Sequence, residues 1–208
     1  AGVSYPTRKK TEGFKAWTRE DVTQYEAYWP EGTRQRVWLH LLLYTGVRRG
    51  DAVTLGRQHI RDGMLIFITE KGRDKRRIEC ARPIEPELAA TLATGPTSDL
   101  AFICGERGEP LVKESFGNMF KASCVAAGIK DKSAHGLRKL SASIWAERGA
   151  TVNELMALFG WLTPQMAALY TEKANRKRLA AGAAARLTGT NAQHSMAPPT
   201  QKVGPTGQ

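Results

Sequence analysis

The stretch from Val37 to Leu43 constrains the fold more than any other part of this sequence. It places apolar side chains on most sides of a predicted helix that starts near Thr33 and ends at Thr45 and Gly46. A helix with so little polar surface is stable only when other elements cover it. We therefore expect this helix to be buried in the core.

Helical periodicity dominates the remaining sequence, and strand character is confined to one region. Thr18, with Asp21 in the following turn, predicts the start of a helix that ends near Trp29. Further helices are predicted over residues 49–55, 87–93, 113–125, 136–148, 152–159, 163–171 and 173–186. Strands are predicted over residues 64–69, 76–80 and 100–104, the first two as a hairpin with a basic tip. The expected fold class is α+β: mainly helical, with a small antiparallel sheet or hairpin.

The 208 residues suffice for one domain with a substantial core. Residues 1–13 are polar and basic and predict a linker or arm, and residues 14–186 form the expected domain. Residues 187–208 are rich in Pro, Gly, Thr and Gln without apolar periodicity, which predicts a disordered tail. The chain starts at Ala1 rather than Met, and we expect it to be a fragment of a longer protein.

Composition narrows the classes of function. The 31 Lys and Arg exceed the 20 Asp and Glu, for a formal charge of +11, which favours a polyanionic partner such as nucleic acid. No apolar run approaches the ~18 residues of a membrane span, which argues against a membrane protein. Cys80, Cys104 and Cys124 suit neither a disulfide framework nor a metal site, and we expect them buried in a reducing cytosol.

Four short motifs carry reactive side chains. They are Thr45–Asp51 with Arg48, Lys71 on the hairpin, His135–Arg138, and Gly160-Trp161 followed nine residues later by Tyr170. Two arginines can hold one phosphodiester, a tyrosine can attack it, and a lysine can protonate the leaving oxygen. A histidine can assist proton transfer, and an indole N–H can donate to a phosphate oxygen. The set amounts to a phosphoryl-transfer site without a metal or cofactor. Taken singly, each residue has an equally simple structural role, such as a helix-end charge or core packing.

The order of these motifs resembles the catalytic domain of tyrosine site-specific recombinases, the phage integrase family. That family's first box, Thr-Gly-x-Arg-x-x-Glu/Asp, is matched by Thr45–Asp51, and its second, His-x-Leu-Arg, by His135–Arg138. Its third box, Leu-Gly-His/Trp with the nucleophile nine residues on, is matched by Phe159-Gly160-Trp161 and Tyr170. Phe159 stands where Leu is usual, and Trp161 where His is more frequent. The resemblance covers about residues 14–186.

The resemblance implies a role for each matching residue. Arg48 and Arg138 would clamp the scissile phosphate, and Tyr170 would attack it to form a 3′-phosphotyrosyl bond and release a 5′-hydroxyl. Lys71 would be the general acid, with Lys75 as the alternative if the hairpin register shifts.

Supporting roles fall to further residues. His135 would assist proton transfer, Trp161 would donate a hydrogen bond, and Asp51 would orient groups around Arg48. The residues expected to contact DNA are Arg49, Arg73, Lys75, Arg76 and Lys139.

The same resemblance implies double-stranded DNA as partner, a homotetramer on DNA and a bacterial cytoplasmic or nucleoid location. Without DNA, a monomer is compatible with the sequence. Family members usually carry an N-terminal DNA-binding domain, and the short segment before the expected catalytic domain is a further reason to expect a fragment. The helix over residues 173–186 would dock in cis or in trans beside the site. The alternatives are strand relaxation like that of a type IB topoisomerase, a non-catalytic DNA-binding protein, and an RNA-binding module. Tyr170 and both arginines favour catalysis over simple DNA binding, and RNA-binding motifs are not evident.

Overall fold

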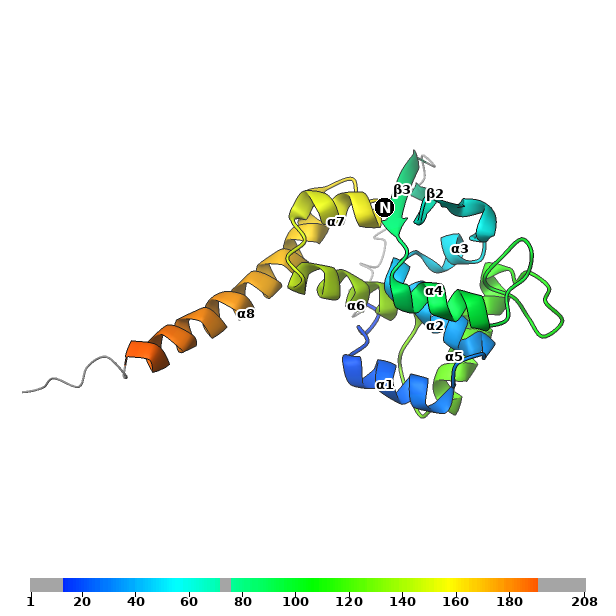
Figure 1. The fold of residues 1–208 in the computed structure, drawn as a ribbon, viewed down its shortest axis with the longest axis horizontal. Helices are drawn as coiled ribbons and strands as arrows, with labels where there is room; N and C mark the ends of the chain where they lie inside the picture. Colours follow the sequence, from blue (N-terminus) through cyan, green and yellow to red (C-terminus); the bar gives the residue numbers. More distant parts are fainter. Residues whose placement is uncertain (1–12, 72–75, 191–208) are drawn as a thin grey trace, which may run out of the picture.

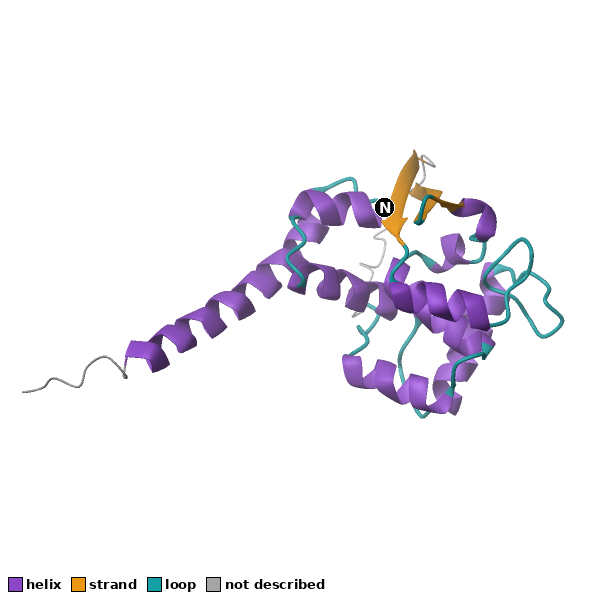
Figure 2. Ribbon diagram, in the orientation of Figure 1, coloured by secondary structure: helices purple, strands orange, loops and turns teal. Residues whose placement is uncertain are grey.

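The structure is a computed structural model that describes residues 13–71 and 76–190 (Figure 1). Its elements, in chain order, are α1 (Arg19–Tyr28), α2 (Arg34–Thr45), α3 (Arg49–Ala52), the 3-10 helix η1 (Arg57–His59), β1 (Ile60–Arg61), β2 (Met64–Lys71), β3 (Arg76–Pro83), α4 (Pro86–Thr94), α5 (Lys113–Ala126), α6 (Ala134–Glu147), α7 (Val152–Phe159) and α8 (Pro164–Thr190). Figure 2 shows helices making up most of the molecule, with the small sheet at one edge. The predicted class, a mainly helical α+β fold with a small antiparallel sheet, is confirmed.

Helix α2 is the centre of the larger core, as its apolar sequence predicts. The Thr33 hydroxyl accepts a hydrogen bond from the Arg36 backbone N–H at its start, and Gly46 ends it in the left-handed conformation at φ 57°. All residues from Val37 to Leu43 are buried. Helices α4, α5 and α6 pack around α2 and remove its apolar faces from water.

The sheet has the order β1-β2-β3 with antiparallel neighbours, and β2 and β3 form the expected hairpin. Alternation along β2 buries Leu65, Phe67 and Thr69 and leaves Ile68 49 % exposed, so one face of the sheet meets the core. The strand predicted over residues 100–104 is wrong. Residues 101–104 are buried and Leu100 is exposed, and within the described residues the segment forms a single isolated bridge, Cys104 to Pro110. Its burial explains its apolar composition without a strand.

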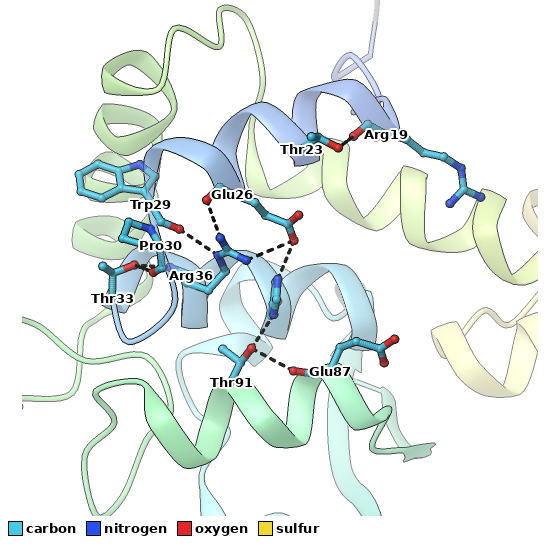
Figure 3. Close-up of polar contacts among 10 residues, drawn as sticks. Arg19, Thr23, Glu26, Trp29, Pro30, Thr33, Arg36, Glu87 and Thr91 are labelled. Carbon is cyan, nitrogen blue, oxygen red and sulfur yellow. Dashed lines mark hydrogen bonds and ion pairs between the residues drawn. The ribbon is translucent and has the colours of Figure 1, made fainter.

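Polar contacts join α1, α2 and α4 at one place (Figure 3). The Glu26 carboxylate on α1 lies 2.8 Å from His40 Nε2 and 3.7 Å from Arg36 Nη1, both on α2. His40 Nδ1 lies 2.6 Å from the Thr91 hydroxyl on α4, and that hydroxyl donates to the Glu87 carbonyl. The hydrogen bond from His40 lowers the pKa of Glu26. His40 therefore stabilises the packing of three helices.

Helices α7 and α8 form the C-terminal part of the described chain. Thr151 and Glu154 cap the start of α7 reciprocally, and Gly160 ends α7 in the left-handed conformation. Two helices were predicted over residues 163–171 and 173–186, but α8 is one helix from Pro164 to Thr190. Its Ala-rich sequence lacks a breaker between the two predicted pieces. Residues 187–190, expected in the disordered tail, are helical, and the rest of that tail lies outside the described residues.

Two expectations from composition are also answered. Cys80, Cys104 and Cys124 are free thiols in buried positions, as predicted. Within the described ranges, no helix is long and apolar enough to cross a membrane.

Candidate active site

Arg48 lies just after the end of α2, where the left-handed Gly46 turns the chain toward the sheet. Its Nη1 donates a hydrogen bond to the Thr69 hydroxyl at 2.8 Å. The Thr69 hydroxyl in turn donates to Asp51 Oδ2 at 2.6 Å, and that oxygen lies 3.7 Å from Arg48 Nη1. Thr69 and Asp51 thus fix the guanidinium, while part of it stays exposed to a ligand.

Arg138 lies in the first half of α6. In contrast to the partly exposed Arg48, it is buried, with an exposed fraction of 6 %. Its Nη1 donates to the Gly46 carbonyl and its Nη2 to the Phe159 carbonyl, both at 2.5 Å. One guanidinium therefore links the end of α2 to the end of α7. Burial, followed by the charges of Arg48 and Arg82, lowers the pKa of Arg138. The starting value is so high that the group stays charged at neutral pH.

Trp161 and Tyr170 belong to a stack of three aromatic rings. The Phe159 and Trp161 rings lie 4.8 Å apart, and the Trp161 and Tyr170 rings lie 5.6 Å apart with only 8° between their planes. Arg138 stands 5.8 Å from the Trp161 ring centroid. Burial raises the pKa of Tyr170, although Arg138 opposes this shift. The phenol is therefore protonated at neutral pH and needs a proton acceptor before it can attack.

His135 lies in the first turn of α6 and its ring stands 4.9 Å from that of Phe14. Partial desolvation, and then the cations Arg138, Lys139 and Arg48, lower its pKa, so the neutral imidazole is favoured. His135 and Arg48 line one hollow of about 430 Å³. Tyr170 lines another hollow, together with residues such as Glu147 and Lys173. His135 and Tyr170 thus line two different hollows, and Arg138 contacts the Trp161 ring that stacks on Tyr170.

The remaining predicted residues have varied placements. Lys71 is the last residue of β2, and its backbone pairs with that of Arg76 in β3. Arg73 and Lys75 lie outside the described residues. Arg49 lines the same hollow as Arg48. Lys139 donates to the Phe14 carbonyl at 2.6 Å, so its ammonium is engaged within the protein.

Sequence reasoning missed the other cations of the hollow that holds Arg48 and His135, which we call the basic hollow. Lys113 and Lys121 on α5 and Lys132 before α6 line it, beside Arg48 and Arg49. Lys113 and Lys121 are eight residues apart, a spacing that repeats on one face of a helix and could have signalled them. Lys132 also pairs with Asp21 at 2.7 Å. Among the described residues, no group of three or more His, Cys, Asp or Glu side chains lies close enough together to bind a metal ion.

Two further residues near the arginines were also missed. Thr69 bridges Arg48 and Asp51, and Arg82 on β3 lies against Phe159. Both are strand residues far in sequence from the motifs they meet, so only the strand register could have indicated them.

Comparison with known proteins assigns the chain to a family. The chain belongs to the phage integrase family, whose model matches residues 19–177. The integrase of Mycobacterium phage FRAT1 is 26 % identical over 157 residues, covering 65 % of this chain and 47 % of that protein. Tyrosine recombinase XerC of Mycobacterium tuberculosis (strain ATCC 25177 / H37Ra) is 28 % identical over 153 residues, covering 70 % of this chain and 51 % of that one. The chain spans about half the length of these relatives.

Solved structures show the same fold at lower identity. The XerA recombinase superposes with a TM-score of 0.63 at 16 % identity, covering 81 % of this chain and 63 % of that chain. A lambda integrase dimer bound to a COC′ core site gives 0.59 at 22 % identity, covering 76 % and 59 %. These matches establish the recombinase catalytic-domain fold.

Proposed function

We propose that this chain is the catalytic domain of a DNA recombinase that cleaves and rejoins strands through a covalent 3′-phosphotyrosyl intermediate. The observation that carries the proposal is the junction at Gly46 and Phe159. There Arg138 joins the segment bearing Arg48 to the aromatic stack bearing Tyr170. Two cations and a tyrosine brought together in this way, in a chain of this family, suit phosphoryl transfer to a tyrosine.

In the first step, the Tyr170 oxygen attacks the scissile phosphorus and the bond to the 5′-oxygen breaks. Negative charge grows on the phosphate oxygens in the transition state, and Arg48 and Arg138 would stabilise it. Arg48 is suited to direct contact because its guanidinium is held by Thr69 yet partly exposed. The Trp161 ring would hold the phenol in position by stacking.

Two protons move during this step. The phenol loses one, and His135 is the proposed partner in that transfer, because its lowered pKa leaves the imidazole neutral at pH 7. The departing 5′-oxygen gains one, from Lys71 or from the alternative, Lys75. In the reverse step, a 5′-hydroxyl attacks the phosphotyrosyl bond, and Tyr170 recovers its proton. The phosphotyrosyl bond conserves the energy of the phosphodiester, so rejoining requires no nucleotide.

The DNA backbone would lie against the basic hollow. Arg49, Lys113 and Lys121 line it beside the proposed phosphate clamp. Contacts of this kind release counterions, so DNA binding should weaken steeply as salt rises. Since the substrate is DNA, we place its action in the bacterial cytoplasm or nucleoid.

Assembly on DNA is proposed as a homotetramer, with α8 contacting a neighbouring protomer. Leu169 and Leu179 on α8 are 62 % and 65 % exposed, which suits burial in a subunit contact. In gel shifts on DNA with two sites, the parent chain should form cooperative complexes. A variant such as Leu179→Ala should form the same complexes at reduced yield. Equal cooperativity, or equal cooperativity after removal of residues 173–208, would contradict this contact.

Covalent trapping tests the proposed reaction. The chain is incubated with supercoiled plasmid or nicked duplex, quenched with SDS, and examined for protein attached to DNA. We expect an adduct in which the protein is on the 3′-phosphate, and a new 5′ end that polynucleotide kinase labels without prior phosphatase treatment. Tyr170→Phe should abolish both signals.

The matched control is Tyr28→Phe, which removes the same hydroxyl from an exposed tyrosine on α1. It should form the adduct as the parent chain does. An adduct that survives in Tyr170→Phe would refute the assignment of the nucleophile. The absence of any adduct from the parent chain would refute catalysis by this chain on its own.

A further inference from the structure

Arg82 on β3 is a buried arginine with two guanidinium nitrogens that have no hydrogen-bond partner in the described part of the chain. It pairs with Leu65 in the sheet and is only 2 % exposed. Its Nε and Nη1 atoms are buried and have no hydrogen-bond partner among the described residues. A charge removed from water normally requires a counter-ion or several hydrogen bonds, because its hydration is costly to lose. The fold therefore keeps Arg82 in an unfavourable environment.

The surroundings of Arg82 belong to the proposed active site. Its guanidinium carbon stands 4.8 Å from the Phe159 ring centroid, and that of Arg138 stands 5.1 Å from the same centroid. The aromatic ring provides some compensation through cation–π attraction. The nearby acid is Asp51, whose carboxylate is already engaged by Thr69 and Arg48. Positive charge thus accumulates at this point without an equal negative charge.

A packing role alone does not account for an arginine at this position. The opposing Leu65 and the adjacent Phe159 are apolar, so an apolar side chain would fill the space without the loss of hydration. Burial, together with the smaller effect of the charge of Arg48, lowers the pKa of Arg82 to about 10, yet the group remains charged at neutral pH.

Building on the proposed function, we propose that Arg82 is a positioning residue for the scissile phosphate. It is a third cation behind Arg48 and Arg138, and its unpaired charge is balanced when a phosphate binds in front of them. It does not touch the phosphate but acts through the field it creates and through Phe159 and Arg138. Since the five-coordinate transition state carries more negative charge than the bound phosphodiester, the same field should favour cleavage.

Thermal unfolding with an anion probe gives the first test. Arg82→Met keeps the length of the side chain and removes the charge, whereas Arg82→Lys retains the charge. Without an anion, Arg82→Met should melt at or above the parent chain. Sodium orthovanadate, at matched ionic strength against chloride, should raise the parent's midpoint by about 5 °C. Vanadate should raise the melting midpoint of Arg82→Met by less than half of the parent's increase. It should raise the midpoint of Arg82→Lys by nearly the full increase.

Covalent trapping gives the second test. The initial rate of adduct formation should fall about tenfold in Arg82→Met, which corresponds to ~1.4 kcal/mol of transition-state stabilisation. Arg82→Lys should recover most of the rate, a rescue that a loss of packing would not produce. Arg34→Met is the matched control, because Arg34 also has a buried Nε without a partner but lies at the opposite end of α2. It should leave both the vanadate response and the adduct rate unchanged.

The outcomes separate this inference from the proposed reaction. Equal vanadate responses in the parent and Arg82→Met would overturn it, as would equal adduct rates in Arg82→Met and Arg82→Lys. If Arg82→Met and Arg82→Gln both unfold far below the parent without anion, the charge serves folding and the inference is wrong. In a further outcome, the parent chain forms no adduct and yet shows a vanadate response that depends on Arg82. That result would refute the proposed strand cleavage and support the role of Arg82 at an anion site.

Discussion

The described chain has two apolar clusters that differ in size and in how they are held together. The larger surrounds α2 and includes Leu137 and Leu140 of α6, whereas the smaller joins α7 and α8 and includes Ala142 and Ala146 of α6. The buried residues in the first half of α6 therefore belong to one cluster, and those in its second half belong to the other. Arg138 lies between the two and bonds to a carbonyl on each side.

The proposed phosphate-binding Arg48 and the proposed nucleophile Tyr170 lie against different clusters. Arg48 is fixed by Thr69 and Asp51 against the larger cluster, where many buried side chains resist movement. Tyr170 is a partly buried residue of α8 that packs on the smaller cluster, where its ring stacks on that of Trp161. A shift of α7 and α8 would thus move the nucleophile without disturbing Arg48, which allows one part to be tested without the other.

Arg138→Met should have the largest effect, because Arg138 serves both clusters. Loss of a donor to the transition-state charge should slow adduct formation by about 10²–10³-fold. The Gly46 and Phe159 carbonyls would lose their donors, and the free energy of unfolding should fall by ~2–4 kcal/mol in chemical denaturation. Arg138→Lys keeps the charge but cannot bond to both carbonyls, so intermediate values are expected. Unchanged stability in Arg138→Met would show that this residue does not join the clusters.

Gly46→Ala tests the close approach of the two clusters. A Cβ at Gly46 would lie 2.5 Å from Phe159 Cε1 and 2.7 Å from Ser141 Oγ, at a residue with φ 57°. Overpacking and the left-handed backbone together should cost ~2–5 kcal/mol, measured by chemical denaturation. Gly108→Ala is the control, because Gly108 has φ 78° and open space around it, so only the backbone cost applies. Equal losses in the two variants would mean that the contact with Phe159 carries no strain.

Thr69→Val tests the hold on Arg48 alone. The substitution keeps the shape of the side chain and removes the hydroxyl that joins Arg48 to Asp51. We expect a loss of ~1–2 kcal/mol of stability and an adduct rate about tenfold lower, because the guanidinium is less firmly placed. Thr69→Ser retains the hydroxyl and should behave like the parent chain in both assays. A Thr69→Val variant with a normal adduct rate would show that Asp51 orients Arg48 without the bridge.

The sequence predicted the fold class and most of the helices, and it singled out the motif residues, because those signals are local. Gly46 and Gly160 follow apolar helices, where left-handed caps are expected, and Thr18 and Thr151 stand at helix starts. Thr69 and Arg82 could not be found in this way. They face the site only because strand register brings a residue of β2 and one of β3 to the ends of distant helices. The predicted break in α8 was also wrong, since no local signal marks where a helix leaves the body of the protein.

His135→Gln should have the smallest effect, and it concerns pH. The folded-state pKa of His135 lies below its ordinary value of 6.5, so protonation is less favourable in the folded chain than in the unfolded one. The parent chain should therefore be more stable above pH 6.5 and lose stability as the pH falls below that value toward the folded-state pKa. Replacing the titrating ring should flatten this part of the profile, measured by denaturation between pH 5 and about pH 7.5. A His135→Gln profile as steep as the parent's would assign the acid sensitivity to another group. Because burial and then the charges of Arg138, Lys139 and Arg48 lower this pKa, the same measurement reports their combined effect on the first turn of α6.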